Sequence, residues 1–449
     1  MFLTSRSRNT LRRQSRFASL HAISSGALQA LADGIMQPVL VLAAIAFLLG
    51  GSNNQIAAFA VIAVATWAFA PLLLQIIGSF VGRSYPIVFS AGFIRLIAVT
   101  VIGVIGFRID DMSTDRIVGT LVASYLAYQV ASSIATQASA GLIVGSVPLS
   151  RQQSVLQRRA FAAVLAAFVA ALVAWSVLRS DETFQRSVGL LLILAALSAF
   201  SATWFLLNIP GGAAPTSNQR PGALFGLALS AFRSVPFRRF IGFKILLALA
   251  AAVDPFLMVF GFRKLGIGIE YIGLSLVAYA AGHVVGHLVW PRWIVNRSPR
   301  VPFQIATFCR LLLLIWVVSL PTIATSTAYT DRFADSTVAM RAFAIGFVFL
   351  GLAGSVGNAA NQRYLLDILP RGATQGAIMA ANLVTAVFAF APLGVAWLLQ
   401  EQELDRILWA AIGCATLALL ASGLLVESRV RIRTSAGSWR SRRRASRAV

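Results

Sequence analysis

The sequence predicts an all-α membrane protein in which twelve transmembrane helices form two pseudo-symmetric bundles of six. Three features lead to this fold class: the apolar composition, twelve apolar runs of membrane-spanning length, and the distribution of charge between the segments that join them. Of the 449 residues, 58% are hydrophobic and 12% are charged, whereas soluble domains carry about 25% charged residues. This composition excludes a soluble globular protein and a disordered chain.

The twelve apolar runs are each about as long as the roughly 20 residues that a helix needs to cross a bilayer. The first follows a basic N-terminus and is too long for the core of a signal peptide, so we expect it to be the first span. Backbone amides in hydrocarbon have no water to bond, so every run is expected to be a helix. The runs cover residues 22–49, 56–81, 87–107, 117–145, 160–178, 187–207, 240–262, 270–290, 302–321, 337–360, 374–398 and 407–426.

Four prolines lie away from the ends of these runs. In a soluble helix they would argue for a break, but in a membrane the neighbouring helices can satisfy the freed backbone groups. They are Pro38, Pro71, Pro255 and Pro392. In the first and seventh runs the proline follows a polar residue, Gln37 in one and Asp254 in the other.

The charges between the runs test the number of spans, because cytoplasmic segments carry an excess of Arg and Lys. If both termini are cytoplasmic, the segments on that side hold 26 basic residues and two acids, and the outer segments hold eight basic residues and eleven acids when Glu270, at the edge of the eighth run, is counted with them. A miscounted span would invert this alternation downstream of the error, and no inversion occurs. The charges therefore predict twelve spans with both termini in the cytoplasm.

The net charge of +23 thus lies on one membrane face, where it attracts anionic lipid headgroups. The lipid bilayer is the expected partner and nucleic acid is not, because a solvated or lipid-touching segment explains the Arg-rich tail better. Lys244 and Lys264 are the only lysines, and this preference for arginine is typical of a GC-rich bacterial genome and hence of an inner (plasma) membrane. Cys309 and Cys414 form no disulfide or metal-ligand pattern.

The longest segment between runs divides the chain into two halves. It is rich in Pro, Gly and Ser, as linkers are. We therefore expect a basic cytoplasmic N-terminus (1–20), a first six-helix bundle (21–207), a cytoplasmic linker (208–239), a second bundle (240–427) and an Arg-rich cytoplasmic tail (428–449).

The two halves resemble each other in sequence. Each has an Arg-Ser turn followed 12 or 13 residues later by an arginine inside a span: Arg83 and Arg95 in the first half, Arg297 and Arg310 in the second. The polar-residue–proline pairs of the first and seventh runs also correspond. Matches in one order at a near-constant offset indicate two six-helix repeats, a known plan of membrane transporters.

Taken together, these features resemble the major facilitator superfamily of secondary transporters over residues 17–428. The resemblance rests on six plus six spans, both termini inside, a long basic central loop and short basic turns after spans 2 and 8. The segment Phe237-Arg238-Arg239-Phe240 entering span 7 looks like many bacterial members. So does the segment after span 10 that contains Arg363 and Asp367.

The superfamily's signature turn after span 2, Gly-x-x-x-Asp-Arg-x-Gly, is only partly present. Gly78 and Arg83 match it, but Gly82 stands where the acid is expected, and after span 8 Asn296 and Arg297 occupy the acid–arginine position. Gly82 cannot form the conformation-locking ion pair that the family makes at this turn. The resemblance nevertheless implies structural or gating roles for Arg83, Arg95, Asn296, Arg297, Arg310, Arg363 and Asp367.

Ionisable residues inside spans are functional candidates, because burying them is costly. Asp33 in span 1 and Asp254 in span 7 are placed near the middle of the bilayer by the helical rise. In the resembled fold these two spans line the central cavity, so both carboxylates are candidates for proton coupling or substrate binding. The alternative is a local hydrogen bond between helices.

Three buried cations have similar alternatives. Arg95 and Arg310 could bind an anionic substrate or pair with Asp33 and Asp254, but a structural ion pair, or extension to the headgroups, is favoured. Lys244, near the cytoplasmic end of span 7, is expected to extend to the headgroups.

Further polar residues are candidates for lining the cavity. His283 and His287 share one face of span 8; two histidines at this spacing can hold a metal, but packing with hydrogen bonds, or a proton relay, explains them better. The cavity-lining candidates are Gln37, Tyr125, Tyr128, Gln129, His283, His287 and Asn358. Such groups can equally serve to hold helices together.

The resemblance implies secondary active transport of a small solute by rocking of two bundles about a midplane site. Protons are the expected coupling ion, and export is slightly favoured over uptake. We expect no cofactor, no metal and no enzyme activity, because the chain has no phosphate-binding loop and no nucleophile elbow. Two alternatives stay open: a non-transporting assembly or scaffold protein on this fold, and a lipid or saccharide flippase.

Overall fold

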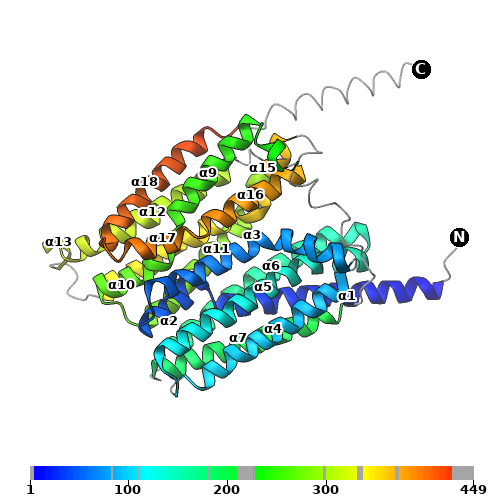
Figure 1. Ribbon diagram of the computed structural model, residues 1–449, viewed down its shortest axis with the longest axis horizontal. Coiled ribbons are helices and arrows are strands. Elements are labelled where there is room, and N and C mark those ends of the chain that lie inside the picture. Colours follow the sequence, from blue (N-terminus) through cyan, green and yellow to red (C-terminus); the bar gives the residue numbers. More distant parts are fainter. Residues whose placement is uncertain are drawn as a thin grey trace.

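The protein is represented by a computed structural model, shown in Figure 1. It describes residues 5–81, 84–109, 111–179, 183–209, 226, 228–296, 300–330, 337–369 and 374–426. Every secondary-structure element in these residues is helical, and twelve of the helical stretches are long and apolar enough to cross a membrane. The predicted all-α fold class with twelve spans is confirmed.

The first half of the chain contributes six of these stretches. Its elements are α1 (Ser5–Ile35), η1 (Pro38–Leu42), α2 (Ala43–Leu48), α3 (Asn53–Val81), α4 (Ser84–Phe107), α5 (Thr114–Ser146), α6 (Leu149–Leu178) and α7 (Phe184–Leu207). Span 1 consists of α1, η1 and α2, and α3 to α7 are spans 2 to 6.

The second half contributes the other six. Its elements are α9 (Val235–Ala251), η2 (Asp254–Phe256), α10 (Leu257–Leu265), α11 (Glu270–Asn296), α12 (Arg300–Ala324), α13 (Thr327–Thr330), α14 (Thr337–Gly354), α15 (Gly357–Ile368), α16 (Thr374–Phe388), α17 (Ala391–Leu398) and α18 (Leu404–Gly423). Span 7 consists of α9, η2 and α10, and span 11 of α16 and α17. Most of the expected linker, 210–225 and 227, lies outside the described residues.

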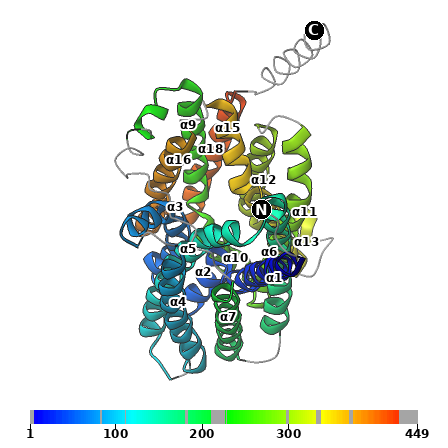
Figure 2. The same ribbon diagram turned by 90° about the vertical axis from the view of Figure 1, so that its right-hand side faces the viewer.

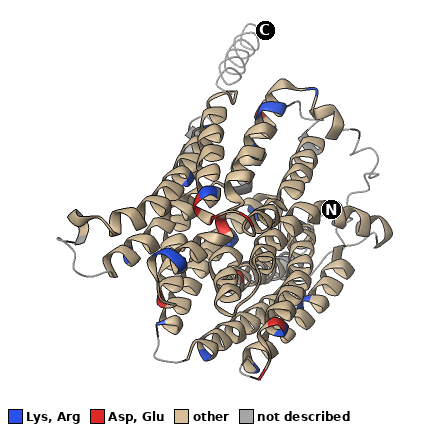
Figure 3. Ribbon diagram, turned by 60° about the vertical axis from the view of Figure 1, so that its left-hand side comes forward, with Lys and Arg blue, Asp and Glu red and all other residues tan. Residues whose placement is uncertain are grey.

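Several helices begin earlier than the apolar runs. The fifth run starts at residue 160, yet α6 starts at Leu149, because arginine and glutamine are good helix formers and extend their heads into water at the membrane surface. The tenth run, 337–360, is not one helix: α14 ends at Gly354 and α15 begins at Gly357. Figure 3 shows that most of each helix is uncharged and that charged residues lie mainly near the helix ends.

The four prolines have different local effects. Pro71 lies inside the continuous helix α3. Pro38 starts a short π-helix, where the Gln37 side chain accepts hydrogen bonds from the amides of Val39 and Leu40. Pro255 lies in the single 3-10 turn η2, and Pro392 lies in the first turn of α17. Spans 1 and 7 are therefore both interrupted, although the sequence predicts one continuous helix for each.

The helices pack as two bundles, α1 to α7 and α9 to α18, which lie side by side in Figures 1 and 2. The bundles meet mainly where α3 packs on α16 and α17, and where α6 packs on α11. Spans 2 and 5 of one half therefore contact spans 11 and 8 of the other. This reciprocal pairing is what a pseudo-two-fold axis between two repeats requires.

The two ends of the bundle pair differ. We define the linker end as the end where spans 1 and 7 begin, and the opposite end as the other. At the opposite end, Phe47 of α2 stacks on Phe262 of α10 at 5.7 Å between ring centroids, and the Arg263 guanidinium lies 5.5 Å from the Phe47 ring. At the linker end, α1 and α9 pack mainly on helices of their own bundles.

Small residues allow α11 and α14 to approach closely. A Cβ atom added at Gly351 would overlap the carbonyl oxygen of Tyr279 and come within 2.8 Å of the His283 amide nitrogen. Close backbone approach through glycine is common between membrane helices. Gly351 therefore packs one helix against the other, as glycine in spans is expected to do.

We predict that Gly351→Ala lowers the free energy of unfolding by about 1–3 kcal/mol, because overpacking at a backbone contact forces the helices apart. The thermal midpoint of the purified protein in detergent measures this effect. Gly413→Ala in α18 is the matched control, since a Cβ there meets nothing within 4 Å. Equal thermal midpoints for the two variants would contradict the close packing inferred at Gly351.

Candidate functional site

Asp254 and Arg310 form an ion pair inside the second bundle. Interruption of span 7 at Pro255 places Asp254 at the start of η2, opposite the middle of α12. The two guanidinium nitrogens Nη1 and Nη2 donate to the two carboxylate oxygens at 2.7 and 3.0 Å. The side chains are 12% and 11% exposed. The pairing foreseen between spans 7 and 9 is therefore present, and it is bidentate, the stronger geometry for such a pair.

The interface between the bundles lies beside this pair. The π-helix η1 of span 1 contacts both η2 and α11, and the polar side chains of Gln37 and Tyr279 lie near each other across this contact. Tyr279 also lies close enough to Asp254 and Arg310 for electrostatic interaction. Polar side chains of the two bundles, Gln37 of span 1 and Tyr279 of span 8, therefore lie near the ion pair.

Asp33 has a different environment in the first bundle. The Tyr128 hydroxyl donates to one carboxylate oxygen at 2.7 Å, and the Gln29 amide donates to the other at 2.9 Å. The same amide group donates to the Tyr128 hydroxyl at 2.8 Å. Among the described residues, no cation lies within salt-bridge distance of Asp33. Its carboxylate is held by neutral donors alone.

Arg95 is fully buried, at 1% exposure, and does not extend to the headgroups. Its Nη2 donates to the Ala199 carbonyl of α7 at 3.0 Å, and its guanidinium lies 5.8 Å from the centre of the Tyr128 ring. Arg95 therefore reaches Asp33 only through Tyr128. The buried acid and arginine of the two halves are arranged differently: Asp254 and Arg310 form a direct ion pair, whereas Asp33 and Arg95 each contact Tyr128.

A cavity of about 340 Å³ lies next to Arg310. It is mostly apolar, and its polar lining groups are Lys244, Arg310, Asn361 and Thr385. One wall residue, Val64, comes from α3 of the first bundle, and the others come from the second. The cavity is therefore built at the interface of the bundles, at the size typical of sites for small ligands.

Lys244 contradicts its expected position. It lines this cavity and is half-buried instead of extending to the headgroups. The reason is its helical face: Lys244, Leu247, Ala248 and Ala251 lie on one side of α9, and that side lines the cavity.

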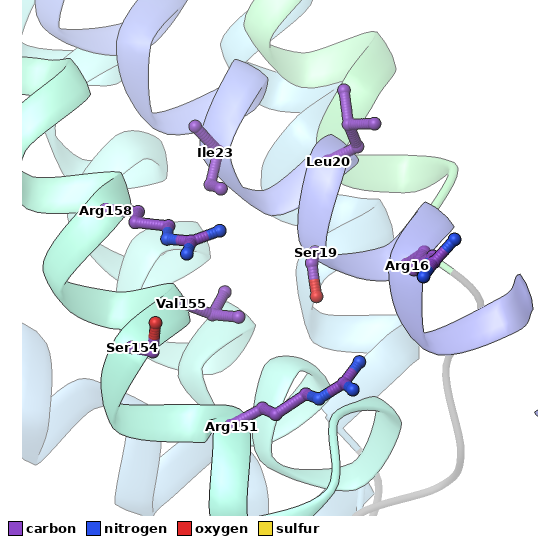
Figure 4. Close-up of a pocket in the computed structure, with 8 residues that line it drawn as sticks. All are labelled: Arg16, Ser19, Leu20, Ile23, Arg151, Ser154, Val155 and Arg158. Carbon is purple, nitrogen blue, oxygen red and sulfur yellow. The ribbon is translucent and has the colours of Figure 1, made fainter. Parts of the chain in front are cut away.

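A second hollow, of about 420 Å³, lies at the linker end between α1 and α6. Figure 4 shows Arg151 and Arg158 on α6, facing the gap toward α1, and Arg16 at its rim. We call this hollow the arginine groove. Its lining residues are Arg16, Ser19, Leu20, Ile23, Arg151, Ser154, Val155 and Arg158.

The remaining candidates lie apart from the cavity or outside the described residues. Tyr125 and Tyr128 are buried in the core of the first bundle, and Gln129 donates to the Tyr125 hydroxyl at 2.8 Å. Arg363 is exposed and Asp367 half-buried. Arg83 and Arg297 lie outside the described residues, as do the side chains of Asn296 and Asn358.

The two histidines of α11 are half-buried. His283 lies near the Tyr279 ring, at 6.1 Å between centroids, and its Nδ1 atom is buried with no partner among the described residues. In the described part of the chain, no group of three or more His, Cys, Asp or Glu side chains is placed to hold a metal ion.

The sequence analysis did not identify two residues that contact the candidate carboxylates or their surroundings, Gln29 and Tyr279. Gln29 lies one helical turn before Asp33 and therefore on the same face, a spacing that could have marked it as a partner. Tyr279 lies one turn before His283 on the same principle. Nothing in the sequence indicates that either crosses to a residue of another span.

The overall fold matches solved transporter structures. A nucleoside transporter, NupG, aligns over 91% of this chain and 98% of its own, with 14% identity and a TM-score of 0.62. A D-xylose–proton symporter aligns over 92% and 98%, with 13% identity and a TM-score of 0.60. The inward-open xylose transporter XylE from E. coli aligns over 93% and 96%, with 13% identity and a TM-score of 0.58.

These neighbours have the major facilitator fold, and the resemblance inferred from the sequence is confirmed at the level of the fold. No protein-family model matches the chain, and no curated protein does either. At identities this low, fold likeness does not carry a substrate from one protein to another.

We predict that Asp254→Leu and Arg310→Met each lower the free energy of unfolding by about 3–5 kcal/mol, because each leaves one buried charge unpaired. The double variant should lose less than either single variant, since it buries no lone charge. A double-mutant cycle on thermal or denaturant unfolding measures both effects.

The matched control is the exposed pair of Lys264 and Asp405, which lie 2.5 Å apart with side chains 47% and 32% exposed. Removing either partner should cost at most about 1 kcal/mol. Additive losses at Asp254 and Arg310 would contradict the pairing.

Proposed function

We propose that this chain is a secondary active transporter that moves a small solute across the inner membrane, coupled to protons, by alternating access. One observation carries the proposal: the cavity between the two bundles adjoins a buried carboxylate–guanidinium pair in an interrupted span. Ionisable groups within a membrane protein characteristically mark solute and proton pathways. Interrupted helices at a repeat interface are the usual setting for such sites.

The structural neighbours support this class of activity. By name, they transport nucleosides or xylose, and one is a proton symporter. All of these solutes are small and polar, and the cavity of about 340 Å³ accommodates a molecule of that size.

The described conformation fits an inward-facing state. The bundles contact each other at the opposite end through Phe47, Phe262 and Arg263. The distribution of basic residues supports a cytoplasmic linker end, with both termini inside. The guanidinium groups of the arginine groove suit the anionic headgroups of the cytoplasmic leaflet, so anionic lipids are the partner we assign to this end.

The two carboxylates have distinct parts in proton coupling. Asp33 has neutral donors as its nearest partners, so a proton can bind it without breaking an ion pair. Asp254 must release Arg310 when it takes up a proton. Protonation of Asp254 thus changes the charge beside the cavity and the contact next to Tyr279 at the bundle interface, which links proton binding to bundle movement.

The alternatives differ in what they require. A scaffold protein on this fold needs no second conformation, and a flippase needs a groove open to the lipid. The cavity instead lies between the bundles, with walls from spans 2, 7, 9, 10 and 11 and from α15, as a solute carrier requires. The flux measurement that tests proton coupling also determines the direction of transport.

Alternating access predicts opposed movements at the two ends. With Cys309 and Cys414 replaced by Ser, spin labels at Ser154 and Val235 report the linker end, and labels at Asn54 and Gln400 report the opposite end. In nanodiscs, conditions that lengthen the distance between the labels at the opposite end should shorten the distance between the labels at the linker end. Asp254→Asn should abolish the dependence of both distances on pH. A single unchanged distance at each end under all conditions would favour the scaffold alternative.

Proton coupling predicts solute-dependent proton movement in proteoliposomes that contain a pH-sensitive dye. The solutes offered are sugars, nucleosides and small organic acids. Asp33→Asn and Asp254→Asn should each abolish the coupled movement, because each removes a group that carries the proton. Asp115→Asn, at an exposed position near the opposite end, is the matched control and should retain it. Flux that survives both changes would overturn the assigned carboxylates and leave the transporter in place.

A further inference from the structure

The cavity has more positive than negative charge at its wall. The positive charges are Lys244 and Arg310, which line the cavity. The negative charge is Asp254, which forms an ion pair with Arg310. Lys244 has no hydrogen-bond or ion-pair partner among the described residues. An ammonium group in an apolar setting is costly when it is left unpaired. One positive charge at this site therefore lacks a counter-charge within the protein.

Arg310 can take part in binding without leaving Asp254. A guanidinium group has five N–H donors, and the two bonds to Asp254 use one from Nη1 and one from Nη2. The other donors are available to a group in the cavity that Arg310 lines. Lys244 lies about two turns before Ala251 at the end of α9, and thus on the linker side of Asp254.

Of the two other polar lining groups, Thr385 donates to the Ala381 carbonyl at 2.9 Å, whereas Asn361 has a polar atom without a partner among the described residues. The Oδ1 atom of Asn361 is buried without a hydrogen bond, although buried polar atoms are normally bonded. The rest of the wall is apolar and includes Phe243, Leu247 and Phe303. The site thus offers positive charge and an amide on one hand, and a hydrocarbon and aromatic surface on the other.

We propose that the transported solute is a small organic monoanion, a carboxylate with an apolar body, bound between Lys244 and the free N–H groups of Arg310. This inference rests on the proposed function and names its substrate class. One negative charge matches the single uncompensated cation, and the apolar walls exclude small inorganic anions by leaving them poorly solvated. Neutral solutes of the same shape leave Lys244 unpaired and bind more weakly.

The two lysines of the chain allow a direct test. Lys244 lines the cavity, and Lys264 is exposed at the opposite end and paired with Asp405, so it serves as a control in the same molecule. Both are acylated with an amine-reactive acetylating reagent, and the rate at each is read by mass spectrometry. Acetate, butyrate and benzoate are added at saturating concentration, and acetamide, butyramide, benzamide and inorganic phosphate are the comparators.

At least one of the carboxylates should slow acylation of Lys244 about tenfold, because occupancy protects the amine in proportion to ligand over Kd. Its amide and phosphate should protect little, and Lys264 should react at an unchanged rate throughout. The proposal is overturned if no carboxylate protects Lys244, if phosphate or an amide protects equally well, or if Lys244 is unreactive without any solute.

Two variants separate charge from folding. The protective carboxylate should raise the thermal midpoint of wild type and of Lys244→Arg, but not that of Lys244→Gln, provided that the unliganded midpoints agree. Equal stabilisation of Lys244→Gln would overturn the assignment. The spin-label distances separate this proposal from the proposed function. If the distances at the two ends change in opposite directions but no carboxylate binds, only the substrate class is wrong. If neither distance changes in the wild-type protein, the transporter function itself is wrong.

Discussion

The structure depends on one constraint: inside hydrocarbon, each backbone group must find its partner within the protein, and each charge must find one in the protein or in a bound ligand. For most of the chain this produces unbroken helices. At two of the prolines that remove a donor, the helix is interrupted and another local structure replaces it. At Pro38 the Gln37 side chain caps a π-helical turn, and at Pro255 a single 3-10 turn joins two α-helices. These interruptions lie at matching positions of spans 1 and 7, and their helical ends contact each other at the bundle interface.

The same constraint acts on charge, and the two halves meet it differently. In the second half, Asp254 and Arg310 neutralise each other directly. In the first half, Tyr128 stands between Asp33 and Arg95, as donor to one and as an aromatic surface beside the other. The two halves thus keep a similar backbone plan, with an interrupted first span in each, while their buried charges have different partners. The two bundles are therefore alike in their helices and different in the contacts of their buried charges.

Hydropathy and charge alternation were enough to predict the spans, because both depend on local composition. They could not predict that α6 extends over 149–159, since polar helical turns leave no apolar signal, nor that α14 ends before the apolar run does. The depth of Asp33 and Asp254 followed from the helical rise, but their partners depend on which spans pack together. Lys244 shows the limit most clearly: its distance from the helix end suggested the headgroups, whereas the face of α9 on which it lies places it at the cavity. Tyr279 joined the site through tertiary packing alone.

The energies of the contacts indicate which parts can move. The contacts of α2 with α10 at the opposite end are an aromatic pair and a cation–π contact, worth about 0.5–1.5 and 0.5–2 kcal/mol. Breaking the Asp254–Arg310 pair costs about 3–5 kcal/mol, and α11 and α14 are held by backbone contact at Gly351. Contacts within a bundle are thus stronger than those that close the opposite end. Reversing a 1:99 population needs about 5.5 kcal/mol of differential binding. That energy is enough to separate the aromatic contacts of α2 with α10 while the packing of α11 on α14 at Gly351 is kept.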